Sequence, residues 1–205
     1  MSSFAVRRAT PNDQTRVLTL VEQTFAASEF GYHGEADIVR QIEELSSGSS
    51  TGQGVEPALR HEERPLWMSW VAEIEETLVG HIFYSLATAR KLQGKESAQS
   101  IQVEGVGLGP MVVHPGHQRQ GIGAALIQQS MAELVQSMFA FACVLGHPEY
   151  YPRFEFSPAS HYGVRHGFAG IPQDVFFIRP LGDRIQFAPD SLVRYLPQFG
   201  SQLEK

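Results

Sequence analysis

Cysteine is almost absent from this 205-residue sequence, in which Cys143 is the only one. A single cysteine excludes an internal disulfide and is typical of a reducing compartment. No apolar run approaches the roughly 20 residues of a membrane span, and the first ten residues, MSSFAVRRAT, lack the apolar core of a signal peptide. We therefore expect a cytoplasmic protein without a membrane partner.

Positive charge is also scarce: 16 Lys and Arg stand against 22 Asp and Glu, a formal net charge of −6. Because neutralising phosphates needs a basic face, general nucleic-acid binding is not expected. The eight histidines show no metal-ligand spacing, so no metal site is predicted. The 42% of hydrophobic residues fit a globular chain with one well-buried domain.

Apolar periodicity predicts strands and helices in alternation along the chain. The sequence Thr10-Pro11-Asn12-Asp13 is typical of a helix start, with Thr10 as N-cap and Pro11 in the first helical position. Two polar stretches, 46–63 and 91–100, are predicted to be loops. The other expected elements are strands at 4–8, 67–74, 78–89, 101–113, 139–145 and 175–179, a helix at 35–45, and a short helical turn near 148–154.

A strand, a helix and a second strand follow one another between residues 101 and 145. This order predicts a right-handed crossover, which makes the strands at 101–113 and 139–145 parallel. We expect the intervening helix to run to about Gln136. Its predicted buried stripe consists of Ile122, Leu126, Met131, Leu134 and Met138.

The most informative stretch is LGPMVVHPGHQRQGIGA, residues 108–124. Small residues at a strand-to-helix turn leave backbone N–H groups bare at the helix N-terminus, where they and the helix dipole bind phosphate. Proline cannot donate to a ladder, so Gly109-Pro110 predicts a bulge whose free backbone, at Met111 and Val113, could pair with an extended amide ligand. The Gly-Lys-Ser/Thr of a P-loop is absent.

The pattern Gln118-x-x-Gly121-x-Gly123 resembles [RQ]-x-x-G-x-[GA], the coenzyme A signature of the GNAT superfamily of N-acetyltransferases. A second segment at 145–156, LGHPEYYPRFEF, resembles the L-G-D-P-x-Y-Y-x-R-F-G-F run of a bacterial branch of predicted acetyltransferases. The resemblance extends from about Phe4 to Leu181. It implies an α/β fold, namely a twisted mixed sheet with helices on both faces and two parallel central strands that splay to admit coenzyme A.

The resemblance implies a domain division and a cofactor site. An N-acetyltransferase domain would cover 1–183, and an extension at 184–205 would pack on it or on a partner subunit. Acetyl-coenzyme A would be the co-substrate. Met111 and Val113 would pair with its pantetheine, and the N–H of Val112 or Val113 would polarise the acetyl carbonyl. Its pyrophosphate would be held by the backbone N–H groups of Gln118, Arg119, Gln120, Gly121, Ile122, Gly123 and Ala124.

The resemblance also implies catalytic roles. Tyr151 would protonate the departing thiolate, although a buried aromatic with a satisfied hydroxyl is the alternative. A base is needed because most amines are protonated at pH 7. Glu104 is the first candidate, since a bulge would shift its side chain onto the face of Met111 and Val113. An ordinary surface carboxylate is the alternative for Glu104, and Glu73 is the second candidate base.

Three residues depart from the family run. Glu155 replaces its glycine, which requires a positive φ or a differently bent turn. Pro152 follows Tyr151 directly and limits the helix there to about one turn. His147 replaces an aspartate. Cys143 lies within an apolar strand and is predicted to be an inert core thiol rather than a nucleophile.

The sequence therefore predicts direct acetyl transfer from acetyl-coenzyme A to an amine of a small molecule or peptide. The alternative is a non-catalytic acyl-coenzyme A sensor or a partner-binding module on the same fold, which the departures at Glu155 and Pro152 support. An acyl group larger than acetyl and a homodimer both stay open. The sequence does not identify the acceptor amine, although the acidic character of the protein favours a cationic one.

Overall fold

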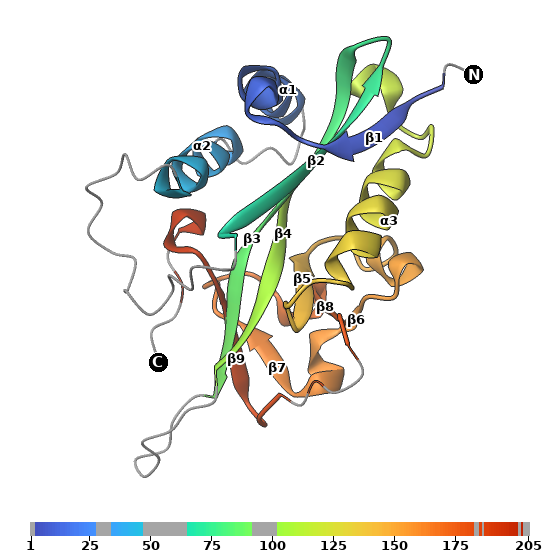
Figure 1. Ribbon diagram of the computed structural model, residues 1–205. Coiled ribbons are helices and arrows are strands. Elements are labelled where there is room, and N and C mark those ends of the chain that lie inside the picture. Colours follow the sequence, from blue (N-terminus) through green and yellow to red (C-terminus); the bar gives the residue numbers. More distant parts are fainter. Residues whose placement is uncertain are drawn as a thin grey trace. The chain divides into compact units, whose positions relative to one another are not determined.

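The chain divides into two compact units, and each is described by itself. The computed structural model describes residues 3–27, 34–46, 65–91, 102–182, 185, 187–200 and 202. The first unit contains residues 1–84 and 109–132, and the second contains 85–108 and 133–205. Figure 1 shows the elements coloured in chain order. Most of both predicted polar loops, 46–63 and 91–100, lies outside the described residues.

The first unit begins with β1 (Ala5–Arg8), which pairs antiparallel with β2 (Trp67–Ile74). Between them in sequence lie helices α1 (Gln14–Ala26) and α2 (Glu35–Ser46). The predicted helix start is confirmed, because the Asp13 carboxylate accepts the N–H and the hydroxyl of Thr10, both at 2.9 Å. A single 3₁₀ turn (Pro11–Asp13) leads into α1.

The strands of the first unit are covered by helices on both faces (Figure 1). On one face, α1 contributes to an apolar cluster that also contains residues of α2, β2, β3 (Thr77–Lys91) and β4 (Gln102–Val113). On the other face, α3 (Ile122–Leu134) lies against Gly80, where an added Cβ would be 2.9 Å from Ile122 Cγ2. Tyr84 Oη and Ser130 Oγ share a buried hydrogen bond of 2.8 Å on the same face.

Helix α3 ends earlier than the sequence predicts, at Leu134 rather than near Gln136. The N–H and the hydroxyl of Ser137 both donate to the Leu134 carbonyl, at 3.0 and 2.6 Å, and so close the last turn. Met138 therefore lies beyond the helix, and it is 62% exposed rather than part of the buried stripe. The other members of that stripe, Ile122, Leu126, Met131 and Leu134, are buried as predicted.

The second unit is built around β5 (Phe141–Leu145). This strand pairs in parallel with β4 at Val106–Leu108, as predicted, and antiparallel with β8 (Phe176–Pro180). The end of β3 pairs with β9 (Ser191–Tyr195). Two very short strands complete the unit: β7 (Val164–His166) pairs with β9, and β6 (Ser157–Pro158) pairs with β8.

Tyr195 of β9 organises the core of the second unit. Its ring lies against Gly107, where an added Cβ would be 2.2 Å from ring Cε1. Its hydroxyl donates to the Cys143 carbonyl at 3.2 Å. Cys143 is fully buried, which confirms a core thiol. Although β9 belongs to the predicted extension at 184–205, the domain boundary at 183 stays a prediction. No helix of the described ranges is long and apolar enough to cross a membrane.

Candidate active site

The turn that follows β4 opens helix α3, and its backbone explains the glycine at 121. Gly121 has a φ of 86°, in the left-handed region that favours glycine. An added Cβ would meet nothing within 4 Å, so the backbone conformation rather than crowding selects glycine there. Arg119 is also left-handed, with a φ of 60°. The Gly121 carbonyl accepts the N–H of Ala125 at 2.9 Å, so the helix begins directly after it.

This turn has the properties of an anion site. The N–H groups of Ile122, Gly123 and Ala124 are the first in a 13-residue helix and have no acceptor within it. The helix dipole adds to their attraction for an anion. Residues 118–121 are exposed, which leaves the site open to a ligand. These features are compatible with a pyrophosphate group, and the binding of pyrophosphate by this turn stays a prediction.

Two glutamine side chains brace the same turn. The Gln118 amide donates to the Val113 carbonyl at 3.1 Å, and the Gln120 amide donates to the Gly116 carbonyl at 3.3 Å. The backbone N–H of Gln118 donates to the Pro115 carbonyl at 3.4 Å. Of the N–H groups predicted to hold pyrophosphate, that of Gln118 thus already has an acceptor.

The end of β4 carries the backbone predicted to meet pantetheine. The His114 N–H donates to the Val79 carbonyl at 2.8 Å, which joins this end of β4 to β3. Met111 and Val113 are half-buried, whereas the side chain of Val112 packs in the cluster with α1. The Val113 carbonyl accepts the Gln118 amide, so the turn after β4 is tied back to the end of that strand. The pairing of Met111 and Val113 with pantetheine stays a prediction.

Tyr151 lies in the second unit, in a 3₁₀ turn (Tyr151–Phe154). Its ring is 5.8 Å from that of Phe156 and 6.5 Å from that of Phe177, measured between centroids. It also lies against Gly146, where an added Cβ would be 2.1 Å from ring Cε2. Burial, reinforced by the neighbouring Tyr150, raises the pKa of the Tyr151 phenol above its ordinary value. The phenol therefore keeps its proton at neutral and mildly alkaline pH.

The residue that replaces the family's glycine, Glu155, ends this turn. Its φ of 65° is left-handed, so the first of the two predicted alternatives is correct. A left-handed conformation at a non-glycine residue costs roughly 1–2 kcal/mol. An ion pair joins its carboxylate to Arg179, although the carboxylate is largely exposed and such pairs contribute at most about 1 kcal/mol. Pro152 limits the turn to four residues, as predicted.

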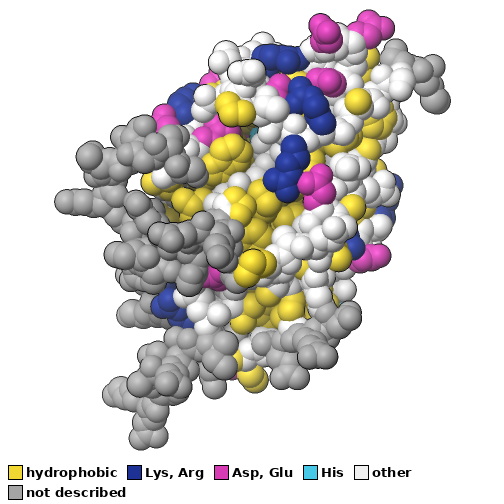
Figure 2. Space-filling view, viewed as in Figure 1, with side chains coloured by type: hydrophobic (Ala, Val, Ile, Leu, Met, Phe, Trp, Pro, Cys, Tyr) yellow, Lys and Arg dark blue, Asp and Glu magenta, His cyan; other side chains and the backbone are white. Residues whose placement is uncertain are grey.

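The two candidate bases have different surroundings. Glu104 is half-buried on the part of β4 that belongs to the second unit, and its carbonyl accepts the Ala140 N–H at 2.9 Å. Glu73 accepts from Arg7 at 2.9 Å, and Arg7 also binds Asp13 at 2.7 Å. Figure 2 shows acidic and basic side chains side by side on its visible face. Glu73 is therefore held by Arg7, and the assignment of Glu104 as the base stays a prediction.

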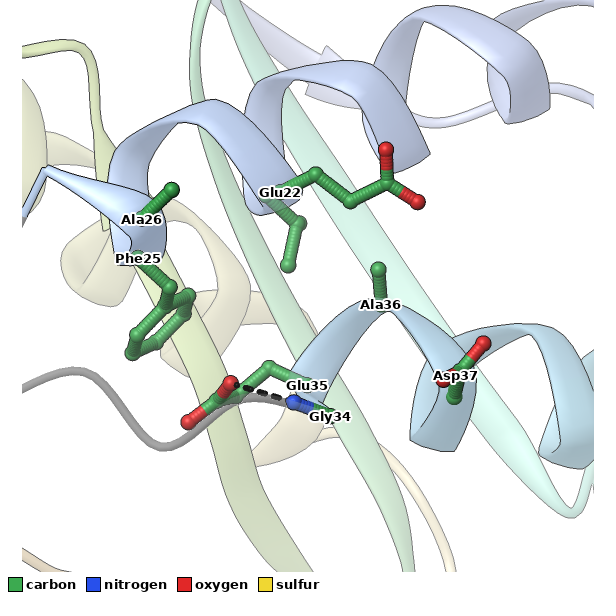
Figure 3. A pocket seen from close by; sticks show the side chains of 8 residues that line it. Glu22, Phe25, Ala26, Gly34, Glu35, Ala36 and Asp37 are labelled. Carbon is green, nitrogen blue, oxygen red and sulfur yellow. Dashed lines mark hydrogen bonds between the residues drawn. The ribbon is translucent and has the colours of Figure 1, made fainter.

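A hollow of about 320 Å³ lies between α1 and the start of α2. In Figure 3, Phe25 extends from α1 toward the start of α2, and Ala36 points back toward α1. Three carboxylates line the hollow, those of Glu22, Glu35 and Asp37. Arg40 forms ion pairs with Glu22 and Asp37, so among the described residues at the hollow the carboxylates outnumber the cations. This surplus would favour a positively charged group.

Comparison with known proteins identifies the family. The model of the acetyltransferase (GNAT) family matches residues 37–150, more than half of the chain. This chain belongs to the GNAT acetyltransferase family. It is 30% identical over 128 residues to the uncharacterized N-acetyltransferase YjhQ of Escherichia coli, a match that covers 62% of this chain and 66% of that relative's length.

Two solved GNAT structures share the fold along almost the whole chain. YhbS of Escherichia coli, in complex with CoA, has a TM-score of 0.69 at 21% identity, covering 97% of this chain and 93% of that one. A GNAT acetyltransferase of Brucella melitensis, in complex with acetyl-CoA, has a TM-score of 0.64 at 23% identity, covering 98% and 100%. The mixed α/β GNAT fold predicted from the sequence is therefore confirmed.

Sequence reasoning missed three residues of the GNAT site region. Gly80 lies under the first turn of α3, Gly146 accommodates the Tyr151 ring, and Arg179 binds the turn after Tyr151. Gly146 stands within the family run, so that pattern could have found it. Nothing in the sequence singles out Gly80 or Arg179. Among the described residues, no three His, Cys, Asp or Glu side chains gather as a metal site requires.

Proposed function

We propose that this protein transfers acetyl from acetyl-coenzyme A directly to an amine. The observation that carries the proposal is the exposed turn at 118–121 in a GNAT chain, which precedes the first N–H groups of α3, groups that have no acceptor within the helix. The GNAT structures in complex with CoA and acetyl-CoA support the choice of co-substrate. The described residues of the turn fit its pyrophosphate.

We assign the following binding and catalytic roles to residues of this chain. The first N–H groups of α3 bind the pyrophosphate, and the N–H of Val112 or Val113 donates to the acetyl oxygen as negative charge develops there. Glu104 accepts a proton from the incoming amine. The neutral amine nitrogen forms a bond to the acetyl carbon, the carbon–sulfur bond breaks, and Tyr151 Oη gives its proton to the departing thiolate. The second proton that the nitrogen loses on becoming an amide then restores the Tyr151 phenol, and Glu104 releases its proton to solvent. Burial raises the pKa of Tyr151 and so keeps the phenol protonated at neutral pH. The same raised pKa opposes transfer to the thiolate, so the transfer depends on the two groups being held close together.

Direct transfer is favoured over a covalent enzyme intermediate. Cys143 is the only cysteine and is fully buried. Burial raises its pKa to about 12, so the nucleophilic thiolate is almost absent at neutral pH. We infer that Cys143 takes no part in the chemistry.

The acceptor that we propose is an amine of a small molecule or peptide. The hollow between α1 and α2, with its surplus of carboxylates, supports a cationic amine. We further infer that residues 1–183 form the acetyltransferase domain and that 184–205 pack on it, because β9 pairs with β3.

A free-thiol assay with acetyl-coenzyme A and a panel of small amines, amino acids and peptides tests the proposal. Tyr151→Phe should slow thiol release by about 10²-fold or more, because it removes the proton donor. Its affinity for coenzyme A, measured by titration calorimetry, should change less than about twofold. Tyr162→Phe removes the hydroxyl of a half-buried tyrosine of the same unit, and as the control it should retain the wild-type rate.

The same assay distinguishes the enzyme from a sensor. Coenzyme A binding by the wild-type protein, without thiol release for any amine, would establish the non-catalytic alternative. A Tyr151→Phe variant as fast as wild type would instead leave the enzyme intact and remove Tyr151 from its mechanism.

A further inference from the structure

A guanidinium group in the second unit holds the turn that carries Tyr151. Arg179 lies on β8, and its Nη1 donates to the carbonyl of Phe154, the last residue of the turn, at 3.1 Å. Its Nη2 forms an ion pair with the carboxylate of Glu155. Arg179 is mostly buried, with a side-chain exposure of 17%. The two contacts end on neighbouring residues, so together they fix the end of the turn.

The same strand also supports the ring of Tyr151. Phe177, two residues before Arg179 on β8, stacks with that ring at an interplanar angle of 29°. After the turn the chain reverses at left-handed Glu155 and runs antiparallel along β8, with Pro158 opposite Phe177. One strand therefore holds the turn at its ring and at its C-terminal end.

Gly146 limits where the ring can lie. An added Cβ at this residue would be 2.1 Å from ring Cε2 of Tyr151, so the ring rests directly on the backbone. The Gly146 N–H donates to the Val175 carbonyl at 2.9 Å, which fixes that backbone beside β8. With the ring held between Gly146 and Phe177, the position of the Tyr151 hydroxyl follows the position of the turn.

We propose that Arg179, with Glu155 as its partner, is a positioning residue for Tyr151. The inference rests on the proposed function, in which Tyr151 gives its proton to the thiolate. Arginine suits the task because its planar fork binds two acceptors at once, whereas lysine offers a single point charge. Glu155, which departs from the family's glycine, supplies the second acceptor. The replacement of the family's glycine by Glu155 is therefore part of how this chain positions Tyr151, and it does not argue against a catalytic role for that tyrosine.

Steady-state kinetics of thiol release test the positioning role. Arg179→Ala should lower kcat about tenfold and leave the KM for acetyl-coenzyme A within about twofold, because misplacement of a reacting group slows only the chemical step. Arg179→Lys should be intermediate. Arg165→Ala removes an exposed arginine of the same unit and should match wild type. In the Tyr151→Phe background, Arg179→Ala should cause no further loss; an equal loss in both backgrounds overturns the inference.

A spectroscopic measurement separates this inference from the proposed function. In protein labelled with 3-fluorotyrosine, the ¹⁹F resonance of Tyr151 is assigned by its loss in Tyr151→Phe. Arg179→Ala and Arg179→Lys should shift and broaden that resonance and leave Tyr195 unchanged. Glu155→Ala should shift the Tyr151 resonance more than Glu155→Gly, because alanine keeps a side chain at a positive φ whereas glycine adopts that φ without strain. If the Tyr151 resonance does not move in Arg179→Lys, the positioning role of Arg179 is refuted, whether or not the protein transfers acetyl.

Discussion

His81 is a polar side chain in apolar surroundings. It is fully buried on β3, and neither ring nitrogen has a hydrogen-bond partner in the part of the chain that the structure describes. Burial lowers the pKa of His81 to about 3, so the ring is neutral at pH 7. An unpaired buried polar group costs about 1–3 kcal/mol, and His81 therefore lowers the stability of the folded protein.

Replacing His81 by leucine should stabilise the protein by about 1–2 kcal/mol at pH 7, because leucine has no polar atoms to leave unpaired. It should also reduce acid sensitivity. With a folded pKa below the unfolded value of about 6.5, the unfolded state binds more protons, so wild-type stability falls by up to about 1.4 kcal/mol per unit as pH drops from 6.5 toward 3.

Urea unfolding at pH 7 and pH 5 measures both effects of His81→Leu. His161→Leu, at an exposed position, is the control and should change neither the stability nor its slope with pH. A His81→Leu protein that is less stable at pH 7 and equally sensitive to acid would show that the imidazole has a partner in solution.

Residues whose role depends on the local backbone could be predicted from the sequence. Residues whose role depends on contact with a distant part of the chain could not. Gly121 was predictable because a strand-to-helix turn demands a left-handed residue nearby. Gly107 was not, because the Tyr195 ring that excludes a Cβ there comes from a strand far along the chain. Tyr151 could be found only by resemblance to a family run, since one tyrosine in an aromatic segment has no periodic signal.

At the scale of elements, the first turn of α3 depends on how closely β3 approaches it. A Cβ at Gly80 would be 2.9 Å from Ile122 and 3.0 Å from Leu126. Ile122 also carries one of the N–H groups at the start of the helix. Close packing of this turn therefore decides where the proposed pyrophosphate donors lie.

Gly80→Val should weaken coenzyme A binding at least tenfold, because the added side chain displaces the first turn of α3 and its N–H donors. The unfolding free energy should fall by about 1–3 kcal/mol from overpacking. Titration calorimetry with coenzyme A measures the first effect and urea unfolding the second. Gly182→Ala adds a methyl group that meets no described residue within 4 Å, and it should alter neither. Unchanged affinity in a destabilised Gly80→Val protein would separate α3 packing from the cofactor site.

Long elements were predictable and short ones were not. Helices α1 and α2 and the hairpin strands β2 and β3 carry enough apolar periodicity to be located within a few residues. Strands β6, β7 and β9 have two to five residues, and their pairing partners define them: β8 for β6, β9 for β7, and β3 for β9. The end of α3 depended on Ser137, whose hydroxyl acts as a local cap that periodicity does not report.

At the scale of the whole molecule, the chain divides into two compact units. The turn predicted to bind pyrophosphate belongs to the first, whereas Glu104 and Tyr151 belong to the second. Chain order could not predict this division, because β3 and β4 each contribute to both units. Several groups of the second unit resist ionisation, because burial raises the pKa values of Cys143, Tyr150, Tyr151 and Tyr195.

These groups should make the protein sensitive to alkali. Each folded pKa lies above its unfolded value, so the associated stability is complete below the unfolded pKa and is lost as pH rises above it. For Cys143 the window runs from about 8.5, the ordinary thiol value, to about 12 in the folded state. Wild-type stability should fall by about 1.4 kcal/mol per pH unit from this thiol alone, and the tyrosines should add to the slope above about pH 10.

The Cys143→Ala variant measures how much the thiol contributes to the loss of stability at alkaline pH. The variant should be less stable at pH 7 because of the small cavity it leaves, yet its unfolding free energy should fall less steeply between pH 8.5 and 10 than that of wild type. Guanidinium unfolding at three pH values in this interval measures the two slopes. Equal slopes would mean that the thiol ionises as readily in the folded protein as in the unfolded chain, and would return Cys143 to consideration as a nucleophile.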